Sequence, residues 1–289
     1  MKLIQRFAPA LFVFLWSTGF IGSKYGLVYA EPYTLLFMRF VLTLAVLAIL
    51  LRHFRPTMPD NWTQRGHLML SGFLLHGLYL GGVFTAIKGG MSAGLTALLV
   101  GLQPVLIALL APWWLRERVT FVHWLGVLLG AAGIYVVLGA GNSFEHGGTN
   151  ALIAAAIALL GITTGALYQK RYCAHHDLLS IAWFQYLPTV VLFALGSLFF
   201  ESRSVTWNAQ FVLALLWLTF ALSIGAILLL SYLIKHGEAS KVTSLFYLVP
   251  PATAIEAYFL FDEPLTGLKV AGMGLVACGV YLAMRPSKS

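Results

Sequence analysis

GLTALLVGLQPVLIALLAPWWLRERVT, residues 94–120, and VTSLFYLVPPATAIEAYFLFDEPLT, residues 242–266, are two versions of one pattern. Each is an apolar run with a proline near its middle and a glutamate close to its end. The residues that match at an offset of 146 or 147 positions are Thr96 with Thr243, Leu98 with Leu245, Pro104 with Pro251, Glu117 with Glu263, and Thr120 with Thr266. Apolar matches arise easily by chance in such a chain, but ordered matches of proline and glutamate do not. The pattern therefore indicates an internal repeat.

The repeat extends in both directions from this motif. The further matches are Thr18 with Thr164, Gly19 with Gly165, Lys24 with Lys170, Lys88 with Lys235, Gly90 with Gly237, Gly126 with Gly272, Gly133 with Gly279, and Tyr135 with Tyr281. The shared glycines in residues 126–138 and 272–282 predict a helix contact, because small residues let helix backbones approach closely. We divide the chain into a first repeat, residues 1–143, and a second, residues 144–289, with GAGNSFEHGGTN at 139–150 as the linker.

The composition excludes an ordinary soluble protein. Of the 289 residues, 60% are apolar and only 10% are charged, whereas a soluble domain carries about 45–50% apolar and about 25% charged residues. So few charges cannot cover a water-exposed surface, so lipid is the expected solvent. The net charge of +8 does not indicate nucleic-acid binding, because the basic residues lie in short gaps between apolar runs and form no stripe. The two cysteines, Cys173 and Cys278, show no disulfide framework or metal-ligand spacing.

The apolar runs predict an all-α integral membrane protein with ten transmembrane helices, since each span needs about 20 mostly apolar residues. The predicted spans are 7–27, 33–51, 68–87, 92–114, 120–139, 150–169, 179–199, 209–233, 241–261 and 267–284. The first run follows Lys2 and Arg6, as in a signal peptide. Because it is long and many others follow, we interpret it as the first membrane helix.

The distribution of lysine and arginine predicts the orientation. With the N-terminus inside, thirteen of these residues lie on the inside and four on the outside, and Arg39 lies within a helix. Cytoplasmic loops of membrane proteins carry such an excess of positive charge. We therefore expect a multi-pass protein of the cell inner membrane with both termini in the cytoplasm.

Each repeat contains five predicted spans, which is an odd number. The second repeat must then enter the membrane from the side opposite to the first, so the fold is expected to consist of two inverted five-helix repeats. Many secondary transporters are built this way and bind substrate at the repeat interface near the membrane midplane. Their usual mechanism is alternating access, in which one repeat rocks against the other.

The motifs also resemble a known family. WSTGFIGSKYGL at 16–27 and MRF at 38–40, together with the two repeated motifs and the glycine-rich runs after them, resemble the EamA family of the drug/metabolite transporter superfamily over nearly the whole chain. In that family a proline in the fourth and ninth helices and a glutamate in the following loops are characteristic. The resemblance implies a ten-helix carrier, usually an exporter of amino acids or related metabolites, without fixing the substrate.

Ionisable residues inside predicted spans are candidates for substrate binding or coupling, because such groups are expensive in a membrane and usually face protein or water. Glu256 is the one acidic residue clearly inside a predicted span; it could exchange a proton, bind a substrate ammonium, or form a structural pair with Arg39. His76 could titrate near neutral pH or hydrogen-bond between helices. Lys24 lies close to the outer end of the first span.

Polar and aromatic residues within spans form a second group of candidates, because apolar and aromatic walls with a few hydrogen-bonding groups suit small amphipathic solutes. They include Trp16, Thr18, Tyr79, Thr164, Tyr168, Trp183, Gln185, Tyr186, Tyr232 and Tyr247. The alternative for each aromatic residue is the interfacial belt. Pro104 and Pro251 are expected either to be tolerated kinks or to line the central cavity as a kinked pair.

These observations favour a transporter over other functions. An enzyme would need a nucleophile, clustered acids or a metal site, but His175 and His176 lie in a loop without metal-spaced partners. A channel would need rings of charge or a filter. We expect no cofactor, and as partners a small-molecule substrate, the lipid bilayer and protons, in a monomer or homodimer. A secondary exporter of amino acids is favoured; export of cationic drugs or other toxic compounds, and import of metabolites, remain alternatives.

Overall fold

The described part of the computed structural model covers residues 2–114, 121–139, 143–227 and 245–283, together with Leu229 and Leu233. Within it, every regular element is a helix. This is the expected structure for an apolar chain, because helices satisfy their own backbone hydrogen bonds in lipid. The residues singled out in the sequence that lie outside the described residues are Glu117, Thr120, Tyr232, Lys235, Gly237 and Thr243.

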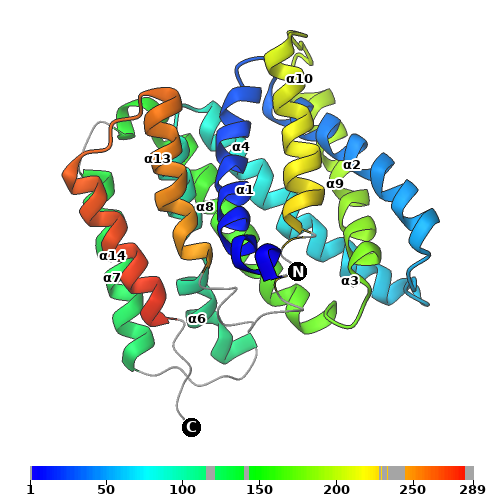
Figure 1. The fold of residues 1–289 in the computed structure, drawn as a ribbon, viewed down its shortest axis with the longest axis horizontal. Helices are drawn as coiled ribbons and strands as arrows, with labels where there is room; N and C mark the ends of the chain where they lie inside the picture. The colour runs from blue at the N-terminus through cyan, green and yellow to red at the C-terminus, as the bar shows by residue number, and fades with distance from the viewer. Residues whose placement is uncertain are drawn as a thin grey trace.

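Helical elements overlap the described part of each of the ten apolar runs (Figure 1). The first half contains α1 (Lys2–Gly26), α2 (Pro32–Phe54), α3 (Trp62–Gly72), η1 (Phe73–Leu78), α4 (Tyr79–Lys88), α5 (Ala93–Val100), α6 (Gln103–Trp114) and α7 (Phe121–Gly139). The second half contains α8 (Ser143–Tyr172), α9 (Leu178–Phe200), α10 (Ala209–Leu216), η2 (Trp217–Ala226), η3 (Leu245–Leu248), α13 (Val249–Phe261) and α14 (Gly267–Ala283).

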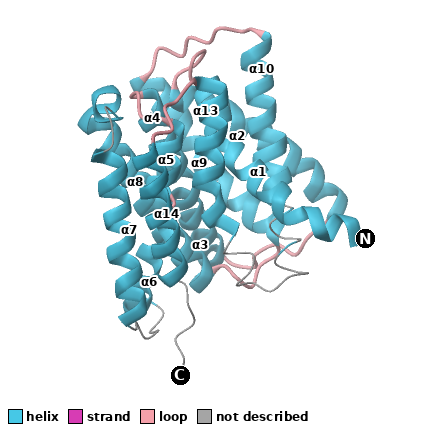
Figure 2. Ribbon diagram, turned by 60° about the vertical axis from the view of Figure 1, so that its left-hand side comes forward, coloured by secondary structure: helices cyan, strands magenta, loops and turns pink. Residues whose placement is uncertain are grey.

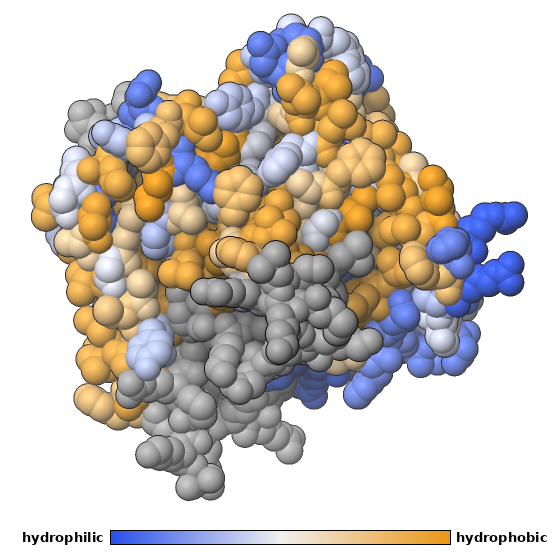
Figure 3. Space-filling model, viewed as in Figure 1, coloured by the Kyte–Doolittle hydropathy of each residue, from blue (hydrophilic) through white to orange (hydrophobic). Residues whose placement is uncertain are grey.

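Six stretches of helix are long and apolar enough to cross a membrane. They are Phe7–Gly26, Pro32–Phe54, Trp62–Lys88, Gly147–Tyr172, Leu178–Phe200 and Ala209–Ala226, and the shorter apolar helices are Ala93–Ile107, Trp124–Val137 and Gly267–Leu282. Figure 3 shows apolar side chains over most of the described surface on one face, with strongly polar ones gathered toward its edges. A full set of ten spans remains a prediction.

The helices run roughly alongside one another, and the loops lie at the two ends of the bundle (Figure 2). Helices of the first half pack against helices of the second: α2 against α9, α4 against α8, α1 against α13 and α7 against α14. In the largest buried cluster the ring of Phe40 on α2 stacks on that of Phe193 on α9, with centroids 5.8 Å apart. This packing holds the two halves together around the space between them.

The glycines shared by the two repeats form the contact between α7 and α14, as predicted. A Cβ atom added at Gly133 would lie 2.6 Å from the carbonyl oxygen of Gly272, and one added at Gly279 would lie 2.6 Å from that of Gly126. Real Cβ atoms essentially never come so close to another backbone. Glycine is therefore required where the two helices touch.

The two prolines do not kink continuous helices, so that expectation is corrected. The fourth apolar run is interrupted at 101–102, and Pro104 is the second residue of α6. In the ninth run η3 gives way to α13, and Pro251 is the third residue of that helix. Proline lacks a backbone N–H, which the first turn of a helix does not need, so it is best tolerated there.

The predicted linker at 139–150 is only partly a linker. From Ser143 onward the chain is already helical, and the helix is broken at Gly148, whose φ of 60° and ψ of −178° are not helical. Glycine adopts such a positive φ without steric penalty because it has no Cβ. The break therefore falls near the end of the predicted linker.

Candidate functional site

A cavity of about 330 Å³ lies between the two halves of the bundle. Its wall comes from α1, α2, η1, α4 and α6 of the first half and from α8, α9, η2 and η3 of the second, with Ile227 just after η2. Most of the wall is apolar, with Trp16, Phe20, Leu75 and Leu222 among its members. The volume falls within the range of roughly 300–1,000 Å³ that is typical of small-molecule sites.

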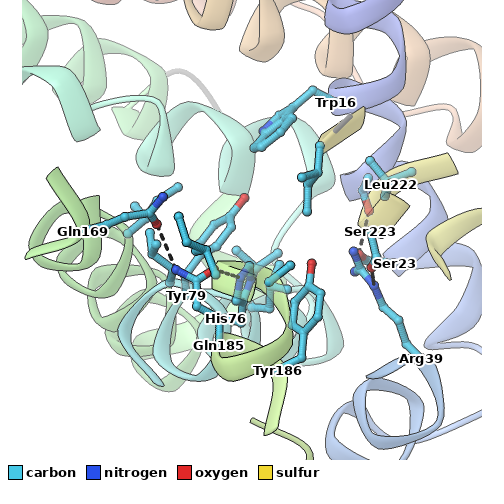
Figure 4. Close-up of a pocket in the computed structure, with 18 of the residues that line it drawn as sticks. Trp16, Ser23, Arg39, His76, Tyr79, Gln169, Gln185, Tyr186, Leu222 and Ser223 are labelled. Carbon is cyan, nitrogen blue, oxygen red and sulfur yellow. Dashed lines mark hydrogen bonds between the residues drawn. The ribbon is translucent and has the colours of Figure 1, made fainter. Parts of the chain in front are cut away.

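One polar group on the wall is centred on Arg39 (Figure 4). This side chain is only 6% exposed, and its Nε donates to Ser223 Oγ at 3.0 Å. Ser223 Oγ in turn donates to the carbonyl oxygen of Leu218 at 3.2 Å, which fixes the serine hydroxyl as the acceptor of the arginine bond. A structural pair between Arg39 and Glu256, one of the alternatives that the sequence left open, is not formed in this conformation.

A second polar group on the wall is centred on Gln185. Its Nε2 donates to Ser71 Oγ and to Gln169 Oε1, both at 3.0 Å, and its Oε1 lies 3.3 Å from His76 Nε2. Because an amide oxygen only accepts, His76 carries a hydrogen on Nε2 in this arrangement. Figure 4 shows this group across the cavity from Arg39 and Ser223, with Tyr186 between them.

Each polar group includes a residue from a segment of π-helix. His76 lies in η1 and Ser223 lies in η2, and both of these elements are π-helical. A π-turn inserts an extra residue into a helix and changes the direction in which side chains point, and such turns are frequent at functional sites. The irregular backbone is thus found where the polar side chains reach the cavity.

The structure places six of the predicted residues on the cavity wall: Trp16, Arg39, His76, Tyr79, Gln185 and Tyr186. The prolines Pro104 and Pro251 and the indole of Trp183 are not part of that wall. Tyr232 lies outside the described residues, and the side chain of Tyr247 in η3 does as well.

Three further predicted residues make bonds elsewhere. Thr18 Oγ1 accepts from Trp217 Nε1 at 3.0 Å, and Thr164 Oγ1 donates to the carbonyl oxygen of Leu160 at 2.7 Å. The hydroxyl of Tyr168 lies 2.6 Å from His67 Nδ1. These contacts give the three residues bonding partners away from the cavity wall.

Sequence reasoning missed four polar residues of the wall. Ser23, Gln103, Gln169 and Ser223 all line the cavity. Two signals were present: Gln103 directly precedes a repeated proline, and Gln169 corresponds to Ser23 at the repeat offset of 146. Ser223 lies in a long apolar run, where nothing in its local sequence distinguishes it, although it corresponds to the candidate His76 at the repeat offset of 147.

Glu256 lies outside the cavity wall, in the contact between α13 and α1. Its Oε1 is 2.6 Å from Ser17 Oγ, whereas its Oε2 is buried and has no hydrogen-bond partner. Ser17 Oγ is also 2.9 Å from the carbonyl oxygen of Phe14. Ser17 directly follows Trp16, which lines the cavity, so Glu256 contacts a sequence neighbour of a wall residue and not the wall itself.

A salt bridge connects the two halves at one end of the bundle. Lys24 Nζ at the end of α1 lies 2.7 Å from Glu263 Oε1, in the loop before α14. The same carboxylate oxygen accepts from the backbone N–H of Ala93 at 2.9 Å, at the beginning of α5. The glutamate of the repeated motif therefore joins three segments and satisfies an unpaired donor of a helix terminus.

Comparison with known proteins identifies the family. The model of the EamA-like transporter family matches the chain twice, over residues 7–139 and 149–285. The chain belongs to the EamA-like transporter family. Since its relatives are transporters and several of its helices are apolar, this EamA-like transporter is a multi-pass membrane protein.

Individual relatives match over almost their whole length. An "Uncharacterized transporter" of Bacillus subtilis is 28% identical, with 97% of this chain and 91% of that protein covered. A "Probable amino-acid metabolite efflux pump" of Salmonella typhimurium is 27% identical, with coverage of 98% and 95%, and a protein of the same name from Escherichia coli is 26% identical, with coverage of 94% and 92%. A solved structure that is 22% identical has the same fold, with a TM-score of 0.69 over 96% of both chains.

Proposed function

We propose that this protein is a secondary transporter, and not an enzyme, that moves small metabolites across the cell inner membrane by alternating access. Its ten transmembrane helices would form two inverted five-helix repeats, residues 1–143 and 144–289. Inverted-repeat transporters bind substrate where the repeats meet, and the cavity between the two halves is the candidate substrate site. The partners are a small-molecule substrate, the bilayer and protons, and the protein acts as a monomer or homodimer.

One observation carries this proposal: residues on the cavity wall recur at the repeat offset. The pairs in which both members line the cavity are Trp16 with Ile162, Ser23 with Gln169, Arg39 with Gln185, Leu75 with Leu222, His76 with Ser223, and Leu80 with Ile227. A cavity on a two-fold axis between repeats would have this property, whereas a cavity within one repeat would not. The pairing therefore supports a site at the repeat interface.

The conformation fits one state of an alternating-access cycle. The cavity wall reaches Leu178, the first residue of α9, next to the loop that follows α8. At the other end of the bundle, Lys24 and Glu263 hold α1 to the loop before α14. With both termini in the cytoplasm, as the lysine and arginine count predicts, this is a state that faces the cytoplasm and is closed outside.

We place amino acids or related compounds first as substrates, and export as the direction. The relatives named as efflux pumps support both choices. The wall argues against cationic drugs, because it carries Arg39 and, among the described residues, no aspartate or glutamate. A permanent cation would therefore meet a positive charge in a site of low dielectric constant, where repulsion is strong.

Glu256 is the proposed proton carrier. The hydroxyl of Ser17 has one hydrogen but lies within bonding distance of both Phe14 O and Glu256 Oε1. If Glu256 is protonated, it donates to Ser17 and the serine donates to Phe14, so both bonds form. If Glu256 is ionised, one of these bonds is lost and a charged oxygen stays buried without a partner. The geometry therefore favours the protonated form in this conformation.

Among the side chains that the structure describes, no charged group packed on α13 offsets an ionised Glu256. The elements packed on α13 are α1, α5, α14 and η3. Their ionisable residues, with the others of α13 itself, are Lys2, Arg6, Lys24, Tyr25, Tyr247, Tyr258, Lys269, Cys278 and Tyr281. Lys24 is bound to Glu263, and Lys269 Nζ donates to the carbonyl oxygen of Pro264. Release of the proton would then follow movement of α1 away from α13, which exposes the carboxyl group.

Transport in proteoliposomes tests the proposal. We would measure uptake of a panel of labelled amino acids with and without a pH gradient, for wild type, Glu256→Gln and Glu31→Gln. The last is the control, because Glu31 lies in the loop before α2, away from the cavity. Gradient-driven transport that is lost only in Glu256→Gln supports the coupling role.

Other outcomes separate the parts of the proposal. Gradient-driven transport at wild-type rates in Glu256→Gln would exclude Glu256 as the proton carrier and make His76 the next candidate. If wild type moves no amino acid of the panel, the amino-acid assignment is wrong. Cationic drugs and other metabolites would then be assayed next.

A further inference from the structure

Arg39 has hydrogen-bonding capacity that the protein does not use. Its guanidinium lies on the cavity wall and makes one side-chain hydrogen bond, from Nε to Ser223. The two terminal nitrogens have no hydrogen-bond partner among the described residues, although the side chain is 94% buried. Among the described side chains, Glu256 Oε2 is the one nitrogen or oxygen atom that is both fully buried and without a hydrogen-bond partner. The unpartnered nitrogens of Arg39 are therefore not fully buried. They are therefore accessible from the cavity.

Among the described residues, the positive charge of Arg39 also lacks a counter-ion. The salt bridge found in the described part of the chain joins Lys24 to Glu263, and no acidic residue of that part lies on the wall. A buried charge without a partner is costly, and proteins normally pair it. An anionic ligand would supply the missing charge, whereas an ammonium ligand would add to the imbalance.

The two repeats form equivalent hydrogen bonds around the cavity, and the charge of Arg39 is where they differ. Gln185 occupies the position equivalent to Arg39, and His76 the position equivalent to Ser223, at offsets of 146 and 147. The bond from Arg39 to Ser223 thus has a counterpart in the bond between Gln185 and His76. Both helices even repeat the threonine four residues later, which donates to the carbonyl oxygen of Arg39 or Gln185. The hydrogen bonds are equivalent in the two groups, but Arg39 carries a full charge where Gln185 carries a neutral amide.

We propose that the terminal nitrogens of Arg39 bind a carboxylate of the transported compound, and that the rest of that compound lies against the apolar wall of Trp16, Leu75 and Leu222. An arginine presents two parallel N–H groups that match the two oxygens of a carboxylate. A single cation balances a single negative charge, so singly charged carboxylates fit and an amino group is not required. This inference rests on the proposed function, because it takes the cavity as the transport site.

Three probes of similar size separate the two charges: 3-phenylpropionate carries the carboxylate, phenethylamine carries the amine, and phenylalanine carries both. We would titrate each into the purified full chain in detergent and follow tryptophan fluorescence, since Trp16 lies on the wall. The variant Arg39→Gln copies the residue already present at position 185. Arg52→Gln is the matched control, with the same change on the exposed part of the same helix.

We expect 3-phenylpropionate and phenylalanine to bind wild type and Arg52→Gln, and to bind Arg39→Gln about 10- to 100-fold more weakly, as for a lost hydrogen-bonded charge. Equal affinity of 3-phenylpropionate for wild type and Arg39→Gln would overturn the proposal. So would tighter binding of phenethylamine than of 3-phenylpropionate to wild type, or no binding of either carboxylate. Should Arg39→Gln not fold, Arg39→Lys decides: it keeps the charge but loses the paired donors, so weaker carboxylate binding is expected and unchanged binding overturns the proposal.

Transport of the same probes in proteoliposomes keeps this proposal apart from the function on which it rests. Uptake of phenethylamine by wild type and Arg39→Gln alike would refute the role of Arg39 and leave the transporter assignment intact. Carboxylate binding that depends on Arg39, without transport of any compound, would support the anion site and contradict the transport function.

Discussion

Replacement of Gly279 by alanine tests the contact between the two repeats most directly. A Cβ atom at this position on α14 would lie 2.5 Å from the backbone nitrogen of Gly130 and 2.6 Å from the carbonyl oxygen of Gly126, both on α7. Both neighbours are backbone atoms, which cannot turn aside as a side chain would. The helices must therefore separate, or the backbone must distort, before the methyl group fits.

The size of the effect follows from two opposing terms. Added volume in a well-packed contact costs about 1–3 kcal/mol. Alanine is a better helix former than glycine by about 1 kcal/mol, which offsets part of that cost. Gly274 supplies the control, because it lies in the same helix and a Cβ atom added there would meet nothing within 4 Å. The helix-propensity gain is common to both substitutions, so their difference isolates the clash.

We expect Gly279→Ala to unfold more readily than Gly274→Ala by about 1–3 kcal/mol, as measured by denaturant titration of the purified protein in detergent micelles. Gly274→Ala should equal or exceed wild type in stability. Equal stability of the two variants would refute the reasoning. It would show that α7 and α14 separate without cost, or that they do not meet at these glycines.

Two further predictions concern the ends of the bundle. Lys24→Met and Glu263→Gln should each destabilise the protein, with a coupling free energy of about 1 kcal/mol in a double-mutant cycle because the pair is only partly exposed. Glu263→Gln should cost more stability, because Glu263 also accepts a hydrogen bond from Ala93 N. A coupling of zero would exclude an energetic role for the pair. Burial raises the pKa of the Cys173 thiol, so its thiolate fraction at pH 7.5 is lower than that of an ordinary thiol. Maleimide labelling of Cys173 in a Cys278→Ala background should therefore be slower in the folded protein than in denatured protein, and equal rates would contradict its burial.

The features that could be predicted from sequence depend on backbone geometry and on repetition. The glycines at 126, 133, 272 and 279 recur in order, and a helix contact without Cβ atoms is what such recurrence requires. The helices themselves follow from apolar runs, since a membrane span permits little else. These inferences need no knowledge of which side chain meets which.

The contacts between side chains could not be predicted in the same way. A pair between Arg39 and Glu256 was one of three possibilities for this glutamate, because both residues are charged and lie at a similar depth in their predicted spans. Depth, however, does not say which way a side chain points around its helix. Arg39 on α2 faces Ser223, and Glu256 on α13 faces Ser17. The expected helix kinks at Pro104 and Pro251 were wrong for a related reason. A proline favours a helix start as readily as a kink, and the sequence around it does not distinguish the two.

The repeat offset proved more informative about the site than any single residue type. Applied to the cavity wall, it relates Arg39 to Gln185 and His76 to Ser223, so that each bond in the first group has an equivalent in the second. Backbone bonds from Thr43 and Thr189 support both groups alike. A fold built from two such halves can keep equivalent helix positions and hydrogen bonds while individual side chains differ between the halves. We therefore expect chemical selectivity to depend on the few paired positions where the two repeats differ. In this chain Arg39 and Gln185 are such a pair, because one carries a full charge and the other a neutral amide.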